Sequence, residues 1–246
     1  MMNVFLVILT AILALPLTGH AESDSVLEVG KFSAAAPGTE FPENWKPLTF
    51  PKIKRHTVYT LIRDGDAVIV KAVSEASSSG LTRDITIDPK EYSIVQWRWK
   101  IGNLLKASDV TRKEGDDYPA RLYITFAYDS SKVSLLEKAK YEAARLLYGQ
   151  YPPLGALNYL WDTKAAKGAV VPNPYTDRAM MIVVESGAAD VNRWITEERN
   201  VYDDYKAAFG EGPPLISGVA IMTDTDNTGE SATAFYGDIV FKKAAQ

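Results

Sequence analysis

The most informative absence from this 246-residue chain is cysteine, because none occurs at any position. A disulfide framework, a cysteine-linked lipid anchor and thiolate metal sites are therefore all excluded. Histidine is almost as rare, and His56 is the only one after residue 21. Zinc hydrolysis and serine–histidine–aspartate catalysis thus lack the residues they need, and no G-x-S-x-G motif occurs. P-loop and G-x-G-x-x-G nucleotide motifs are also absent.

A strong excess of charge is missing as well. The net charge is −4, and no basic patch interleaved with aromatic residues occurs. We therefore expect no nucleic-acid partner. Hydrophobic residues make up 46% of the chain, which is the composition of an ordinary globular protein with a sizeable core.

The amino terminus has the pattern of an export signal. Residues 4–17, VFLVILTAILALPL, form an apolar run that is too short to span a bilayer comfortably. Small residues follow at Gly19 and Ala21, as at a signal-peptide cleavage site, although no Lys or Arg precedes the run. We expect residues 1–21 to be a signal peptide and the protein to be periplasmic or secreted, with no membrane span after cleavage. A retained membrane anchor is the alternative.

Most of the remaining chain, residues 22–246, has the patterns of β-strands, and we expect it to form a single domain. Residues 57–62 and 67–73 flank Asp64-Gly65, a dipeptide typical of a tight hairpin turn. Further strands are expected at 93–101, 120–128, 179–185, 215–223 and 232–241.

Two of these strands allow side chains to be assigned to a face. In SIVQWRWKI, at 93–101, apolar and polar residues alternate, so we expect Trp97 and Trp99 to be buried in the core. For the last strand, we expect inward side chains at Phe235, Ile239 and Phe241 and outward side chains at Tyr236 and Asp238.

Two helices interrupt the strands. Ser134 and Glu137 have the spacing of a capping box, and the helix that they open should end at Gly149. A second helix is expected from Asn200 to Phe209. Many strands and few helices favour a mainly β fold, a two-sheet antiparallel β-sandwich or jelly roll with two short helical insertions.

Four motifs make the chain resemble a known family: WRWK at 97–100, GDDYPAR at 115–121, the segment 194–199 and AIMTDTDNTG at 220–229. They are similar to those of an uncharacterised bacterial exported family, catalogued as domain of unknown function 3047. The resemblance extends from about Trp45 to Phe241. This family has no established activity, so the resemblance assigns no catalytic residue. The ending Asp238-Ile239-Val240-Phe241 also resembles the final strand of galactose-binding-like jelly rolls, which implies that architecture.

The motif GDDYPAR provides the first candidate binding residues: Asp116, Asp117, Arg121 and, two residues further on, Tyr123. Adjacent aspartates point in different directions, so we expect only one of them to pair with Arg121. Such a clamp either fixes the loop or holds a pair of ligand hydroxyl groups. Arg121 and Tyr123 should share the polar face of their strand, which is a binding platform if it is concave and merely solvated if it is convex.

Further binding candidates lie near loops. Trp161 and Trp194 can form an aromatic rim on which sugars stack, or they can pack beneath a helix. Glu198 and Arg199 precede the second helix, where they can contact a ligand or form ion pairs. A glutamate among aromatic residues can also act as a general acid if it is buried.

The loop after residue 222 is a candidate metal site. Asp224, Asp226 and Thr228 place oxygen atoms at alternate positions, which suits calcium. The EF-hand pattern fails, because its last position is occupied here by Phe235. The loop is therefore a calcium site, a ligand-facing loop or a plain turn, and no cofactor is required by the sequence.

The function favoured by these patterns is binding of a carbohydrate or another polyhydroxylated ligand. One alternative is a glycan-active hydrolase or lyase that uses two carboxylates, drawn from Asp116, Asp117, Glu198, Asp224 and Asp226. The other alternative is a structural or protein-interaction module. Whether the protein is an enzyme stays open at this level.

Overall fold

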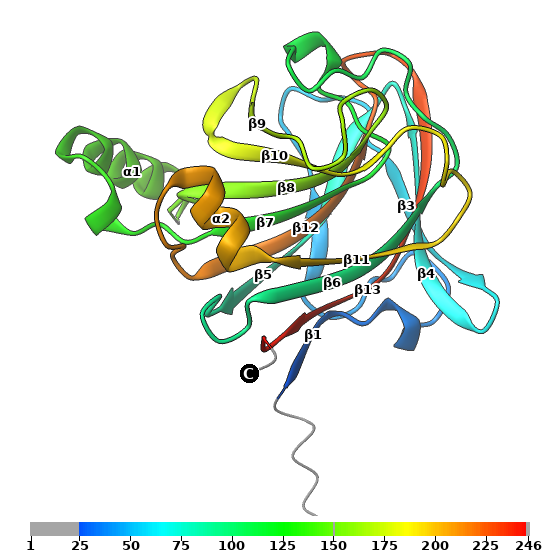
Figure 1. Ribbon diagram of the computed structural model, residues 1–246, viewed down its shortest axis with the longest axis horizontal. Coiled ribbons are helices and arrows are strands. Elements are labelled where there is room, and N and C mark those ends of the chain that lie inside the picture. Colours follow the sequence, from blue (N-terminus) through cyan, green and yellow to red (C-terminus); the bar gives the residue numbers. More distant parts are fainter. Residues whose placement is uncertain (1–24, 150, 245–246) are drawn as a thin grey trace, which may run out of the picture.

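The computed structural model describes residues 25–149 and 151–244, so the predicted signal peptide lies outside the described residues. Two β-sheets pack face to face (Figure 1). The first has the order β11-β6-β13-β4-β3, with β1 paired to β13. Its strands are β1 (Val26–Gly30), β3 (Val58–Asp64), β4 (Ala67–Glu75), β6 (Ile94–Ile101), β11 (Ile195–Asn200) and β13 (Ser231–Lys242). We call it the six-stranded sheet.

The second, seven-stranded sheet has the order β2-β5-β12-β7-β8-β10-β9. Its strands are β2 (Trp45–Leu48), β5 (Ser78–Ile87), β7 (Arg121–Phe126), β8 (Gly155–Asp162), β9 (Val170–Asn173), β10 (Thr176–Ser186) and β12 (Ile216–Asp224). Two sheets with few helices confirm the predicted β-sandwich. One pair departs from the predicted antiparallel arrangement, because β8 and β10 are parallel. The chain can run this way because β9 lies between them in sequence and pairs antiparallel with β10.

The helices begin and end where the sequence predicts. Helix α1 (Leu135–Tyr148) starts with the capping box of Ser134 and Glu137 and ends at Gly149, which has a left-handed backbone. Helix α2 (Val201–Phe209) is capped by the side chain of Asn200. Three short 3-10 helices complete the elements: η1 (Phe32–Ala34), η2 (Lys113–Gly115) and η3 (Ser130–Lys132). Among the described residues, no helix is long and apolar enough to cross a membrane.

An aromatic core lies between the sheets. Trp97 and Trp99 are buried, as predicted, and their rings meet edge to face with centroids 5.4 Å apart. Trp97 also packs on Tyr159, and Trp99 on Trp161, from the facing sheet. Because large aromatic side chains bury the most area, these contacts join the two sheets at their centre.

The last strand corrects one prediction about side-chain direction. Ile239 and Phe241 point inward as expected, but Tyr236 is only 1% exposed and Phe235 is half-buried on the outer face. The reason is a bulge, since the register of β13 against β6 shifts between Tyr236 and Ile239. An extra residue in a strand reverses the alternation on one side of it, so a strict period of two gives the wrong face for Phe235 and Tyr236.

Candidate functional site

Arg121 is the centre of a buried polar network at the start of β7. Its Nε donates to Asp224 Oδ1 (2.8 Å), and Nη2 donates to Asp224 Oδ2 and to the carbonyl oxygen of Asp116. Nη1 donates to Asp116 Oδ1 (3.1 Å) and to the Tyr123 hydroxyl (3.0 Å). The predicted clamp between one aspartate and Arg121 is therefore present, and a second carboxylate, Asp224, joins it.

This network leaves Arg121 no capacity for a ligand. A guanidinium has five N–H donors, and each of those on Arg121 already has an acceptor in the protein. Arg121 is 2% exposed, and its guanidinium also lies 4.3 Å from the ring centroid of Tyr118. The geometry favours the loop-fixing role, in which Arg121 ties the segment before β7 to the end of β12.

Asp117 points away from its neighbour, as expected, and fixes a different loop. Its carboxylate accepts hydrogen bonds from the backbone amides of Asn227 (3.3 Å) and Thr228 (2.6 Å). Carboxylate oxygens of Asp117, Asp224 and Asp226 all lie within 4.8 Å of one another. Two of the predicted calcium ligands thus come together, and Asp117 joins them as a third carboxylate.

In this acidic cluster, Asp117, Asp224 and Asp226, burial and the charge of Arg121 have opposite effects on the pKa of Asp117 and Asp224. Burial raises the pKa of Asp224 to about 8, although the charge of Arg121 works in the opposite direction. Burial likewise raises the pKa of Asp117. Carboxylate oxygens are ligands that calcium prefers, but Arg121 beside Asp224 repels a cation. The Thr228 hydroxyl oxygen accepts a hydrogen bond from the amide of Glu230 (3.4 Å), and hydrogen bonding by the Thr228 side chain to Asp117 works against the rise in the pKa of that carboxyl. Calcium binding therefore stays a prediction.

Trp161 lies in the core and not at a rim. It is completely buried, its ring packs on Trp99, and its Nε1 donates to the carbonyl oxygen of Gly187 (3.1 Å). Trp194, by contrast, is half-buried just before β11. Its Nε1 donates to Asp64 Oδ2 (2.8 Å), which fixes the orientation of the indole. Of the two predicted aromatic candidates, only Trp194 has a surface that a ligand can reach.

Trp194 belongs to a group of aromatic and cationic side chains on the outer face of the six-stranded sheet. The Arg98 guanidinium and the Lys100 ammonium lie 4.8 and 5.0 Å from its ring centroid. Lys100 lies 4.6 Å from the ring of Phe235 as well, and it forms an ion pair with Asp64 (3.2 Å). Cation–π contacts of this kind hold charged side chains in defined positions.

A cavity of about 230 Å³ opens beside Arg98, and we call it the Arg98 cavity. Its lining residues are Gln96, Trp97, Arg98, Thr196, Asp238 and Val240. In residues 25–149 and 151–244, the side chains of Gln96, Arg98 and Thr196 have no hydrogen bond or ion pair to the protein. Sequence analysis placed Gln96 and Arg98 on the polar face of their strand, but alternation alone does not reveal that these groups lack partners.

Glu198 and Arg199 are engaged in ion pairs. Glu198 is exposed and pairs with Lys242 (3.1 Å), and Arg199 Nε donates to Asp204 Oδ2 (2.9 Å). The buried acid in this strand is the preceding residue, Glu197, which sequence analysis missed. Burial, together with the nearby charge of Glu185, raises the pKa of Glu197 to about 7.

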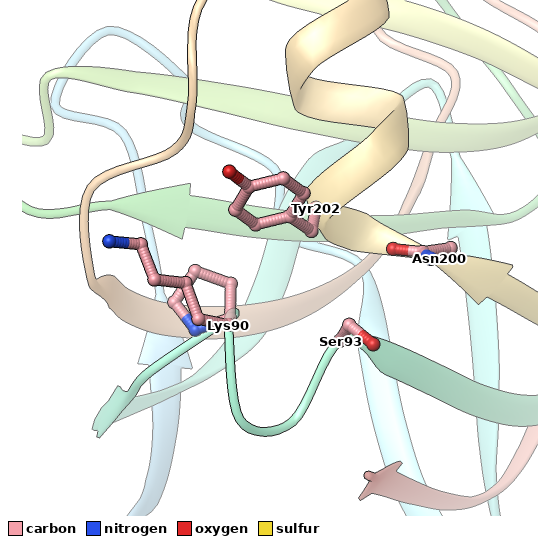
Figure 2. Close-up of a pocket in the computed structure, with 5 residues that line it drawn as sticks. Lys90, Ser93, Asn200 and Tyr202 are labelled. Atoms are coloured by element: carbon pink, nitrogen blue, oxygen red, sulfur yellow. The ribbon is translucent and has the colours of Figure 1, made fainter. Parts of the chain in front are cut away.

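Two other cavities open at the surface of the described residues. One, of about 220 Å³, lies between Lys90, Ser93, Asn200 and Tyr202 (Figure 2), and Asn200 is committed to capping α2. The other, of about 250 Å³, is lined by residues that include Lys132 and Arg178. Both of these cations have carboxylate partners. Among the described residues Arg98 has none, so of these three cavities the Arg98 cavity is the one lined by an unpaired guanidinium.

Comparisons with known proteins give one family and several distant structures. A family model described as "Protein of unknown function (DUF3047)" matches residues 43–240, and no curated protein matches the chain. Among solved structures, the Emp47p carbohydrate recognition domain is 14% identical, with a TM-score of 0.43, covering 91% of this chain and 97% of that one. The xylan-binding module CBM15 is 10% identical, with a TM-score of 0.34 and coverages of 91% and 99%. The agarase AgWH50C is 7% identical, with a TM-score of 0.36 and coverages of 90% and 25%.

Proposed function

The chain belongs to the DUF3047 family, and we propose that it binds carbohydrate on the outer face of its six-stranded sheet. One observation carries this proposal: Gln96, Arg98 and Thr196, which have no side-chain partner among the described residues, line one cavity, and the Arg98 guanidinium lies 4.8 Å from the ring centroid of Trp194. Polar groups at a surface that lack internal partners are available to the hydroxyl groups of a ligand.

The chemistry of these side chains suits a sugar. The Gln96 amide offers both donors and acceptors, the Thr196 hydroxyl offers both as well, and Arg98 offers donors only. Such groups can bind neighbouring hydroxyl groups of a sugar ring, while an indole contacts its apolar C–H face. The cavity is smaller than the roughly 300–1,000 Å³ of sites for drug-sized ligands, so we expect it to hold a single sugar unit.

The scaffold beneath these groups is rigid. Arg98 and Thr196 are direct partners in the ladder between β6 and β11, and Gln96 lies two residues from Arg98 on the same face. Trp194 is held by its hydrogen bond to Asp64 and by two cations. Side chains that are already ordered lose little conformational entropy when a ligand binds.

Four of the five candidate acids for an enzyme, all except Asp226, have partners in the protein. Asp116 and Asp224 hold Arg121, and Asp117 holds the loop amides of residues 227 and 228. Glu198 is paired with Lys242. Because these carboxylates have protein partners, the arrangement supports binding better than hydrolysis, and export of the protein to the periplasm or beyond stays part of the proposal.

Retention of the purified protein on a panel of polysaccharide affinity gels tests this function. We expect retention with the glycan left intact, and Trp194→Ala or Gln96→Ala should weaken it about tenfold or more. Tyr151→Ala is the matched control, because Tyr151 is a partly exposed aromatic residue near α1, outside the cavity. Circular dichroism checks that each variant is folded. Equal retention of all variants, or no retention on any gel, would overturn the proposal.

A further inference from the structure

We infer that the Arg98 cavity selects an anionic sugar of the uronate class, whose carboxylate binds the Arg98 guanidinium. This inference rests on the proposed carbohydrate binding and adds the chemical class of the ligand.

The charge distribution on this face points to an anion. Lys71, Phe235 and Lys100 are neighbours across β4, β13 and β6, so the two lysines flank the aromatic ring. Lys100 has an acid partner in Asp64. Lys71 and Arg98, in contrast, form no ion pair among the described residues. This face therefore carries uncompensated positive charge on a protein whose net charge is −4.

Among the described residues, the nearby acids form no ion pair with Arg98, although Asp238 shares its cavity. Both carboxylate oxygens of Asp238 accept hydrogen bonds from Ser33, one from its amide and one from its hydroxyl. Glu198 is paired with Lys242. A carboxylate accepts about four hydrogen bonds, so Asp238 keeps capacity for the hydroxyl groups of a sugar in the same cavity. The carboxylate for Arg98 must then come from the ligand.

A bulge in the neighbouring strand β13 makes room for the Arg98 side chain beside the cavity. The bulge at Gly237 and Asp238 lies opposite Arg98 in the ladder between β13 and β6. A β-carbon on residue 237 would lie 2.5 Å from Arg98 Cγ, so only glycine leaves room for this side chain. The Arg98 guanidinium also packs on the Trp194 ring, 4.8 Å from its centroid. Bulges commonly redirect side chains at functional sites.

The shape of the guanidinium favours a carboxylate. Its planar fork binds a carboxylate through two parallel hydrogen bonds, which an ammonium group cannot do. Gln96 and Thr196 are then left for hydroxyl groups, so a ligand that uses the whole cavity carries both a carboxylate and hydroxyls. A uronate sugar has this combination, whereas a neutral sugar or a simple organic anion has only half of it.

Calorimetric and NMR titration of the purified protein tests this inference. The probes are D-glucuronate, D-galacturonate and their oligomers, the neutral sugars D-glucose and D-galactose, and acetate. We expect uronates to bind about tenfold or more tightly than neutral sugars, with affinity that falls as salt is added. Arg98→Gln should remove this preference, and Arg63→Gln, at an exposed position on β3, should leave it unchanged.

The outcomes separate this inference from the proposed function. Neutral glycans that bind through Trp194 with no preference for uronates would overturn the inference and leave carbohydrate binding intact. Acetate that binds as tightly as the uronates would also overturn it, because the cavity would then be only an anion site. An unchanged preference in Arg98→Gln would do so as well. No binding of any sugar would overturn both proposals.

Discussion

Gly237 lies beneath the side chain of Arg98, so close that a β-carbon at position 237 would be 2.5 Å from Arg98 Cγ. The contact spans two neighbouring strands, because Arg98 lies on β6 and Gly237 in the bulge of β13. The bulge that reverses the direction of Phe235 and Tyr236 therefore also makes room for the cation of the cavity. The bulge at Gly237 thus determines both that Tyr236 is buried in the core and that Arg98 fits on the outer face.

Gly237→Ala should displace Arg98 and damage the cavity. We expect destabilisation of about 1–3 kcal/mol from overpacking, and a loss of uronate binding similar to that of Arg98→Gln. Urea denaturation and calorimetry measure the two effects. In the double variant Gly237→Ala/Arg98→Ala the clash is absent, so its stability should exceed the additive expectation by about 0.5–3 kcal/mol. Strict additivity would show that the two residues do not interact.

Arg121→Met should destabilise the fold strongly. The substitution keeps much of the side-chain volume but leaves Asp116 and Asp224 buried without their cation. Breaking a buried ion pair in this way typically costs about 3–5 kcal/mol. Arg63→Met is the control, and an exposed position should change stability by less than about 0.5 kcal/mol. If chemical denaturation shows Arg121→Met within that smaller range, the network does not stabilise the fold.

Several elements of this fold follow from local patterns and are recovered from the sequence, whereas the strands β1, β2, β5, β8, β9 and β11 were not predicted. The capping box at Ser134 and Glu137 and the hairpin at Asp64-Gly65 are specified by residues close in the chain. Alternation over 94–101 similarly identifies the buried face of β6. The bulge at Gly237 cannot be predicted in this way, because an unpaired residue depends on the partner strand as much as on its own sequence.

The site is less predictable than the fold, since its contacts are long-range. Arg121 and Asp116 are five residues apart and their pairing was predicted, but Asp224 is 103 residues from Arg121. Trp161 and Trp194 were both candidates for an aromatic rim, yet Trp161 is in the core and Trp194 is accessible. Burial of this kind depends on which strands become neighbours, and a single sequence does not contain that information.

Glu197 should make stability decrease as pH rises. Its pKa in the folded protein is about 7, raised from an ordinary value of 4.5 by burial and by the charge of Glu185. A raised pKa means that the folded state holds the proton more tightly, so the contribution is complete below about pH 4.5 and is lost as pH rises through 7. We expect a loss of about 2–3 kcal/mol over this range.

Denaturation between pH 4 and 9 measures this effect in Glu197→Gln. The variant should lose only the share of the decrease that Glu197 contributes between about pH 4.5 and 7, and it should keep the share of Asp224, whose raised pKa of about 8 extends the decrease to higher pH. Glu198→Gln is the control, because Glu198 is exposed and paired with Lys242. A stability that rises between pH 5 and 7 in the unmodified protein would contradict the prediction.

Calcium should stabilise the protein if the acidic cluster holds it. Asp117, Asp224 and Asp226 bring carboxylate oxygens within 4.8 Å of one another, and among the described residues Arg121 is the buried counter-charge that pairs with this cluster. At a calcium concentration of 100 times the dissociation constant, the stability gain would be about 2.7 kcal/mol. The gain should grow as pH rises toward 9, because the raised pKa values of Asp117 and Asp224 mean that protons compete with the metal.

Asp226→Asn provides the sharpest test, because it removes one carboxylate without touching the contacts of Arg121. We expect it to abolish the effect of calcium on thermal unfolding, whereas Asp66→Asn, at an exposed turn, should leave the effect unchanged. If neither calcium nor a chelator shifts unfolding at pH 9, where the carboxyls are ionised, the loop after β12 is a turn held by Asp117 and the backbone amides of residues 227 and 228.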